Sequence, residues 1–100
     1  MNDRELLELA AKAAGIEVGR YDDGAGFNYP DTNAWWNPLT DDGDALRLAV
    51  KLRIEIRLGP HDAMAHQGFR RSHAESYGSD QYAATRRAIV RAAAEIGRVM

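Results

Sequence analysis

Cysteine is absent from the 100 residues, and only 3 prolines, 2 tryptophans and 2 phenylalanines are present. The lack of cysteine excludes disulfide bonds, thiol nucleophiles and cysteine-ligated zinc or iron–sulfur sites. No apolar run approaches the roughly 20 residues that a membrane-spanning helix needs. The first residues are polar and acidic, whereas a signal peptide begins with a basic and then an apolar stretch. We therefore expect a cytoplasmic protein with no membrane partner.

The residues that are present are typical of a folded globular domain, with 45% hydrophobic and 28% charged side chains. We expect residues 1–100 to form a single domain. The net charge of −2 hides an uneven distribution, because residues 1–50 hold ten acidic and four basic side chains and residues 51–100 hold five acidic and nine basic ones. We expect these charges to pair within the fold or to be solvated, with an electropositive surface for an acidic partner as the alternative.

Three segments have the periodicity of amphipathic helices, at about residues 3–14, 41–52 and 80–99. In the first, Asn2 and Glu5 have the spacing of a capping box, and Gly15 is placed to end the helix. Thr40 or Asp41 caps the second. The residues expected on the buried faces are Leu6, Leu9, Ala10 and Ala13, then Ala45, Leu46, Leu48, Ala49, Val50 and Leu52, then Ile89, Ala92, Ala93, Ile96 and Val99. Asp44 is expected on the solvent side of the second helix.

Residues 53–58 alternate between charged and apolar side chains, which predicts a strand with Ile54, Ile56 and Leu58 on one face. We expect this strand to be the central one of the sheet. Residues 16–34 read as two short strands around a turn, and residues 61–78 as one or two further antiparallel strands. The predicted fold class is α/β (α+β), a three-layer sandwich with three helices around a small, mainly antiparallel sheet of three to four strands.

Residues 4–16, 36–48 and 82–97 together resemble the phage ABA sandwich domain, a family of small proteins of unknown function from phages and prophages of proteobacteria. The segment that carries the resemblance best is Trp-Asn-Pro-Leu-Thr-Asp-Asp-Gly-Asp-Ala-Leu-Arg-Leu at residues 36–48. The resemblance implies a sheet between helical layers and a phage or prophage origin. It implies no activity, no catalytic residue and no cofactor.

Two adjacent tryptophans, Trp35 and Trp36, would point to opposite faces of a strand. We expect Trp36 to pack in the core. Trp35 is the candidate for an exposed binding anchor, with burial of both rings as the alternative.

Metal and catalytic sites find weaker support in the sequence. The three histidines, His61, His66 and His73, would form a zinc site only if strands brought them to one face, and solvated histidines are the preferred interpretation. Asp31 with Glu55 resembles the carboxylate pair of a metal-dependent nuclease, but Arg57 stands where such enzymes need a lysine. The acidic residues at 41–44 are explained by helix capping. We expect no catalytic residue, no bound metal and no cofactor.

Several arginines make nucleic-acid binding the alternative function, because a basic helix can follow phosphates. The candidate residues are Arg70, Arg71, Arg86, Arg87 and Arg91. The preferred interpretation is a non-enzymatic phage accessory protein, a monomer or weak homo-oligomer, that binds a host or phage protein. A metal-dependent nuclease is the distant alternative.

Overall fold

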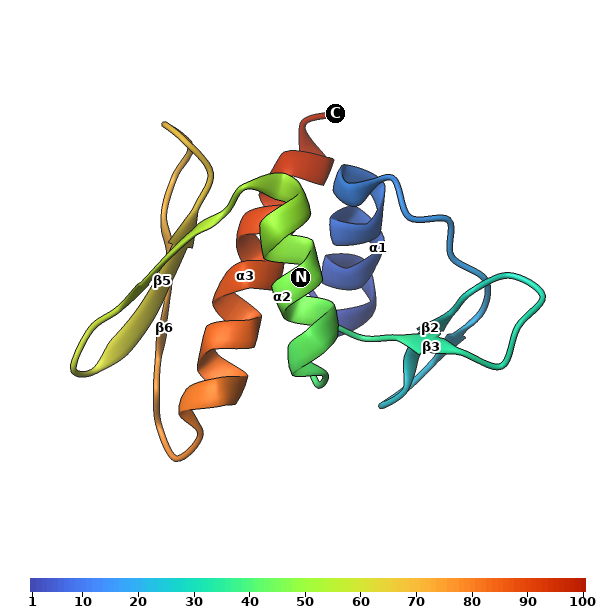
Figure 1. The fold of residues 1–100 in the computed structure, drawn as a ribbon, viewed down its shortest axis with the longest axis horizontal. Helices are drawn as coiled ribbons and strands as arrows, with labels where there is room; N and C mark the ends of the chain where they lie inside the picture. Colours follow the sequence, from blue (N-terminus) through green and yellow to red (C-terminus); the bar gives the residue numbers. More distant parts are fainter.

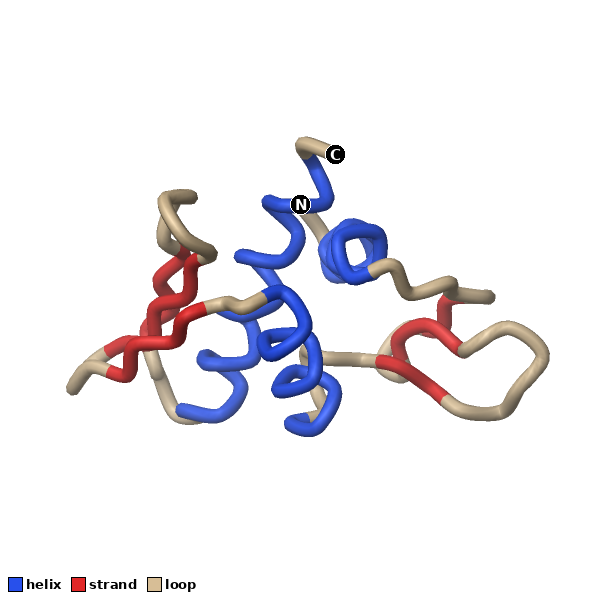
Figure 2. The backbone as a smooth tube through the Cα atoms, turned by 45° about the horizontal axis from the view of Figure 1, so that its top comes forward, coloured by secondary structure: helices blue, strands red, loops and turns tan.

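The computed structural model describes residues 1–100 and contains three helices and two three-stranded antiparallel sheets. The helices are α1 (Asp3–Ala14), α2 (Asp42–Leu52) and α3 (Gln81–Arg98). The N-terminal sheet consists of β1 (Tyr21–Asp22), β2 (Gly26–Asn28) and β3 (Trp35–Trp36), and the C-terminal sheet of β4 (Glu55–Leu58), β5 (Asp62–His66) and β6 (His73–Ser76). The helices lie between the two sheets (Figure 1), and their central position is also clear in the tube view of Figure 2.

The helix–sheet sandwich expected from the sequence is confirmed, but the expectation of a single sheet is wrong. Within each sheet, every strand pairs with the strand that precedes or follows it in the chain. Each sheet is therefore a local antiparallel meander. In the chain, α2 separates β3 from β4. In space, the helical layer separates the N-terminal sheet from the C-terminal sheet (Figure 1), so the two sheets cannot join into one.

The helix ends follow the sequence closely. The Asn2 side-chain oxygen accepts from the Glu5 backbone N–H at 2.8 Å, and the Glu5 carboxylate accepts from the Asn2 backbone N–H at 3.5 Å, which completes the predicted capping box. Gly15 ends α1 in the left-handed conformation, at φ 69°. Of the two candidates for the cap of α2, Asp41 is the one that accepts from the backbone, at Asp44 N. None of the three helices is long and apolar enough to cross a membrane.

The most extensive contact in the molecule is between α1 and α3. Both helices carry many buried alanines, whose small side chain lets two helix backbones approach closely. The buried alanines of α1 and α3 are Ala10, Ala11, Ala14, Ala84, Ala88, Ala92, Ala93 and Ala94. Gly97 marks the tightest point, because a Cβ atom at this position would lie 2.0 Å from the backbone oxygen of Leu9.

The apolar stripe of α2 is only partly buried, contrary to the sequence-based expectation. Ala45, Leu48 and Ala49 are buried, but Leu46 is 61% and Val50 is 69% exposed. The reason is that α2 lies at the edge of the helical layer and packs mainly on α3, so no element covers its outer side. In α3 the same correction applies to Val99, which is 57% exposed at the end of the helix.

The expectation that the strand beginning at Glu55 is the central one is also wrong. In the C-terminal sheet the strand order is β4-β5-β6, so β4 is an edge strand and β5 is central. The exposed fraction rises along the apolar face of this segment, from 8% at Ile54 to 38% at Ile56 and 65% at Leu58. The strand therefore diverges from the helices as it proceeds, and its last apolar residues lie open.

The segment that leads from β3 into α2 is held by a buried carboxylate. Asp44, which was expected in solvent, is 7% exposed and accepts a hydrogen bond from the Asn37 backbone N–H at 2.9 Å. Arg47 donates to the same carboxylate at 2.7 Å, and this hydrogen bond raises the pKa of Arg47. The most distinctive sequence motif of the chain is thus a structural joint between the N-terminal sheet and α2.

We expect the Gly97→Ala substitution to lower the free energy of unfolding by about 1–3 kcal/mol, because the added methyl group overlaps the backbone of α1. Intrinsic helix propensity alone would favour alanine over glycine by about 1 kcal/mol. Denaturant unfolding followed by circular dichroism measures the change. Gly43→Ala in the first turn of α2 is the matched control, because its Cβ would meet only side-chain atoms of Arg47 and Asp41 at 3.2 Å. If both substitutions leave stability equal or higher, the tight α1–α3 contact is not as described.

Candidate functional sites at the two edges of the C-terminal sheet

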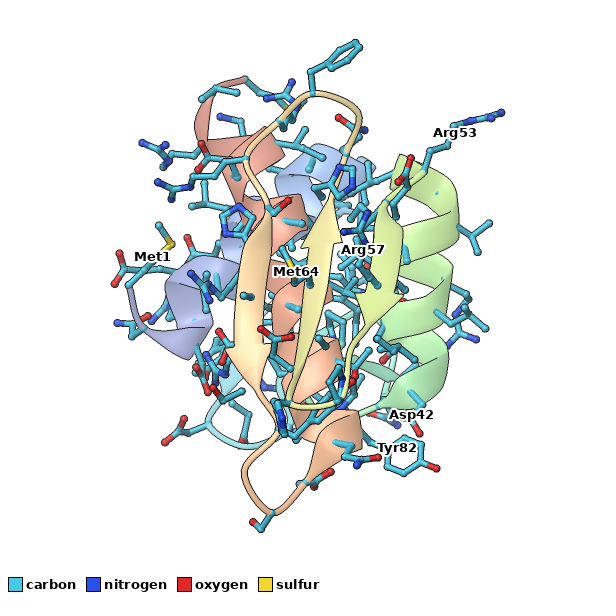
Figure 3. All side chains as sticks on the ribbon, turned by 90° about the vertical axis from the view of Figure 1, so that its left-hand side faces the viewer. Met1, Asp42, Arg53, Arg57, Met64 and Tyr82 are labelled. Carbon is cyan, nitrogen blue, oxygen red and sulfur yellow. The ribbon has the colours of Figure 1, made fainter.

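The edge of the C-terminal sheet next to α2 borders an apolar groove of about 450 Å³, here called the β4 groove. Seven hydrophobic residues line it: Ala45, Leu46, Ile56, Leu58, Tyr77, Tyr82 and Ile89. They come from α2, from β4 and from the region around the start of α3. Figure 3 shows this side of the molecule, with Asp42 and Tyr82 at one end of the groove and Arg53 and Arg57 toward the other.

Two polar side chains, Tyr77 and Arg86, fix the walls of the β4 groove. The Tyr77 hydroxyl donates to the backbone oxygen of Gly59 at 2.8 Å and so anchors the turn after β4. Arg86 donates to the Leu39 backbone oxygen at 2.8 Å and to the Asp42 carboxylate at 2.6 Å, which ties α3 to the start of α2. The groove is therefore held open by contacts that do not depend on an occupant.

The groove is unusually exposed for an apolar surface. Leu46, Leu58 and Tyr82 are 61%, 65% and 71% exposed. Large contiguous apolar patches are uncommon on monomeric proteins and mark interaction surfaces. Beside them, β4 has no strand on its outer side, so that part of its backbone N–H and C=O groups lacks a strand partner.

Two cations border this edge without a carboxylate partner. Arg53 ends α2, and Arg57 projects from the outer face of β4. Their side chains take part in none of the ion pairs of the structure, whereas most other arginines do. Glu55 is the one acidic residue of β4, and its carboxylate lies 3.3 Å from a ring nitrogen of His66.

The opposite edge of the C-terminal sheet borders a second cavity, of about 590 Å³ and polar, here called the β6 cavity. Its charged lining residues are Arg71, Glu75, Arg87, Arg91, Glu95 and Arg98. Three of the arginines have carboxylate partners: Arg87 contacts Asp3 at 2.9 Å, Arg98 contacts Glu95 at 2.9 Å, and Arg91 contacts Glu75. The hydrogen bond from Arg98 lowers the pKa of Glu95, which keeps this carboxylate ionised.

His73 lies in the wall of the β6 cavity and is the least expected polar residue of the fold. It is 4% exposed, and neither ring nitrogen has a hydrogen-bond partner in the chain. Burial lowers the pKa of His73, and the positive charges of Arg91 and Arg71 lower it further. The ring is therefore neutral at pH 7, with one N–H donor and one acceptor nitrogen unpaired. A solvated histidine was expected from the sequence, but His73 is buried.

The arginines proposed for nucleic-acid binding are divided among different sites. Arg86 lies beside the β4 groove, Arg87 and Arg91 line the β6 cavity, and all three are paired with carboxylates. Arg70 and Arg71 lie in the exposed loop between β5 and β6, where Arg70 donates to Gln67. They do not form one continuous basic face of α3.

The two tryptophans lie in the N-terminal sheet, on the far side of the helices from both sites (Figure 1). Trp36 is 2% exposed and packs in the core, as expected. Trp35 is half-buried, and the guanidinium of Arg20 lies 5.6 Å from the centre of its ring. A cation–π contact therefore already covers the proposed anchor in part.

The candidate metal and nuclease sites are not assembled. No group of three or more His, Asp or Glu side chains is placed to hold a metal ion, so the three histidines do not meet. Asp31 lies in the loop between β2 and β3, whereas Glu55 begins β4 on the opposite side of the helices (Figure 1). The carboxylate pair expected for a nuclease is therefore split between the two sheets.

The burial of His73 predicts a specific loss of stability in acid. Because folding lowers its pKa from 6.5, the unfolded chain binds the proton more readily, so stability falls as the pH drops below about 6.5. We expect His73→Leu to lose less stability than the wild type between about pH 7.5 and pH 5, measured by thermal or denaturant unfolding. His61→Leu, at an exposed histidine, is the control and should retain the wild-type pH dependence. A wild-type pH dependence in His73→Leu would contradict the assignment.

No protein-family model, curated protein or solved structure matches this chain. The resemblance to the phage ABA sandwich domain, and the phage origin it implies, therefore stay predictions.

Proposed function

We propose that this protein is a non-enzymatic binding module that holds an extended, apolar segment of a partner protein against β4 and in the β4 groove. The observation that carries the proposal is the coincidence, on one side of the molecule, of an open strand edge and an exposed apolar groove. Together, the two features match both requirements of peptide recognition by strand addition.

The edge of β4 would supply the backbone part of this recognition. An added strand forms main-chain hydrogen bonds with an exposed edge, and these give affinity that depends little on sequence. A strand edge without such cover is otherwise a risk for aggregation, and β4 is protected by charged residues at Glu55 and Arg57 and by its length of 4 residues. A bound segment would extend the C-terminal sheet from three to four strands.

The groove would supply the side-chain part. In an added strand, alternate side chains point toward the helices, where Leu46, Leu58 and Tyr82 are exposed. Burying apolar area contributes about 25 cal/mol per Å², so one or two large apolar side chains of the partner would dominate the affinity. The groove volume of about 450 Å³ lies within the range of about 300–1,000 Å³ that is usual for binding pockets.

The charges at this edge indicate which partner fits. Arg53 and Arg57 have no carboxylate partner in the chain, so acidic residues next to the apolar ones would find complementary charge. A second copy of this chain would instead bring two sets of unpaired cations together, which opposes self-association. We therefore favour an apolar segment with acidic flanks from a different protein.

The same contacts favour this proposal over the alternatives from the sequence. Nucleic-acid binding by α3 would require Arg86, Arg87 and Arg91 to leave their carboxylate partners, which would offset part of the attraction to phosphate. The nuclease hypothesis is less favoured because its carboxylates lie on opposite sides of the helices. The family resemblance contributes nothing to the choice, since it implies no activity.

The test begins with a library of displayed random peptides, selected on the wild-type protein. We expect the selected peptides to combine large apolar residues with aspartate or glutamate. Fluorescence anisotropy then measures the affinity of a synthetic peptide for variants. Leu58→Glu should weaken binding by at least about tenfold, which corresponds to about 1.4 kcal/mol. Proline at alternate peptide positions should also weaken it, because proline lacks the N–H that pairs with β4.

Val50→Glu is the matched control, because Val50 is 69% exposed and lies outside the groove. It introduces the same charge at similar exposure and should leave the affinity nearly unchanged. Equal loss in both variants, or no selected peptide, would contradict the proposal. Sedimentation and gel-shift measurements on the same proteins cover the competitors: a dimer abolished by Leu58→Glu, or salt-sensitive DNA binding without peptide binding, would replace it.

A further inference from the structure

We propose that the β6 cavity is a binding site for the oxyanion group of a small ligand, held by Arg71, the guanidinium groups beside it and the ring of His73. The site lies at the sheet edge opposite to the β4 groove, so it is independent of the peptide-binding function proposed above. It would take a phosphate or a carboxylate group.

The cavity has more hydrogen-bond donors than acceptors. An arginine side chain has five N–H donors and no acceptor. Arg87 uses one nitrogen for Asp3, and Arg91 uses one nitrogen for Glu75 and the Ala74 backbone oxygen. Arg71 makes no side-chain contact of this kind. A ligand that fills the cavity must therefore bring acceptors, and oxyanions are the acceptors that guanidinium groups bind best.

The charge of the site agrees with this donor excess. Arg87, Arg91 and Arg98 are each balanced by one carboxylate, from Asp3, Glu75 and Glu95. Arg71 is the one arginine of the lining without such a partner. The cavity thus keeps a positive charge that an anion can neutralise. The existing ion pairs hold the neighbouring guanidinium groups in place, so that less side-chain freedom is lost on binding.

His73 is the independent observation that points to a ligand. A buried polar group without a partner is costly and is rarely retained without a role. Its ring is 4% exposed, lies in the cavity wall on the inner face of β6, and has both nitrogens unpaired. The neutral ring carries one N–H, which would donate to an oxyanion oxygen once the atoms that cover the ring nitrogens move aside. The positive charges of Arg71 and Arg91, which lower the pKa of His73, are the same charges that would attract the anion.

The size of the cavity indicates that the anion is part of a larger molecule. A volume of about 590 Å³ exceeds what a single phosphate group occupies and matches the range of about 300–1,000 Å³ typical of small-ligand sites. Met1, Leu6 and Ala94 provide the apolar part of the lining. An organic anion would place its charged group near Arg71 and His73 and its body against this surface.

The test observes the His73 ring directly by nitrogen-15 NMR of the full chain at about pH 7.5, where the ring is neutral. Its signals are assigned by their loss in His73→Leu. Inorganic phosphate is added in one titration and acetate in another, with sodium chloride adjusted to keep the ionic strength constant. We expect a saturable shift of the His73 signals with at least one of the two, and the stronger response identifies the preferred oxyanion chemistry.

Two neighbouring arginines provide the matched variants. Arg71→Gln should weaken the apparent affinity by about tenfold, because it removes the unpaired charge of the cavity. Arg70→Gln makes the same chemical change one residue earlier, at a side chain that donates to Gln67 and does not line the cavity, and should leave the affinity unchanged. Circular dichroism confirms that both variants are folded.

The proposal is overturned if neither anion gives a saturable shift at His73 at concentrations of tens of millimolar. It is also overturned if Arg70→Gln and Arg71→Gln change the response equally, since that would indicate screening of general surface charge. Peptide binding at β4 plays no part in these measurements. Failure here would therefore leave the proposed function standing, and failure of the peptide experiment would leave this site standing.

Discussion

The close approach of α1 and α3 is the constraint on which the arrangement of the other elements depends. At Gly97 the two backbones come so near that a single methyl group would overlap the Leu9 carbonyl. Alanines on both helices permit this distance and leave α3 buried on several sides. As a result, α3 supports α1 and α2 on one side and β5 on the other. The buried residues thus form one continuous core in which alanines are combined with larger side chains such as Leu7, Leu48 and Trp36.

This central position of α3 also explains why the two candidate sites exist. The C-terminal sheet packs on α3 mainly through β5 and β6 and contacts the flanking helices little. The two edge strands, β4 and β6, therefore extend beyond the sides of α3. A hollow remains at each edge of the sheet. The hollow toward α2 receives apolar side chains such as Leu46 and Leu58. The hollow toward α1 receives arginines and His73. One small sheet thus borders two surfaces of opposite chemistry.

Ion pairs between distant parts of the chain explain the uneven distribution of charge along the sequence. Asp3 and Asp42 in the acidic half pair with Arg87 and Arg86 in the basic half. The pairing expected from composition is therefore present, although exposed pairs of this kind contribute only about 0–1 kcal/mol each. Their larger effect is to occupy arginines that the sequence offered as phosphate contacts. Of the cations that have no carboxylate partner, Arg53, Arg57 and Arg71 border the two proposed sites.

The sequence by itself determined the helices and most of their ends, because capping and periodicity are local: Asn2 caps the first helix as its spacing predicts, and Asp41 is one of the two caps expected for the second. It also determined the hairpin-forming segments and the burial of Trp36. Only the tertiary structure decided that there are two sheets, that β4 is an edge strand, and that Leu46 and Val50 stay exposed. These three features depend on which helix or strand covers each side of an element. The burial of Asp44 and His73 has the same reason. Periodicity identifies an apolar face, but only packing decides whether anything covers it.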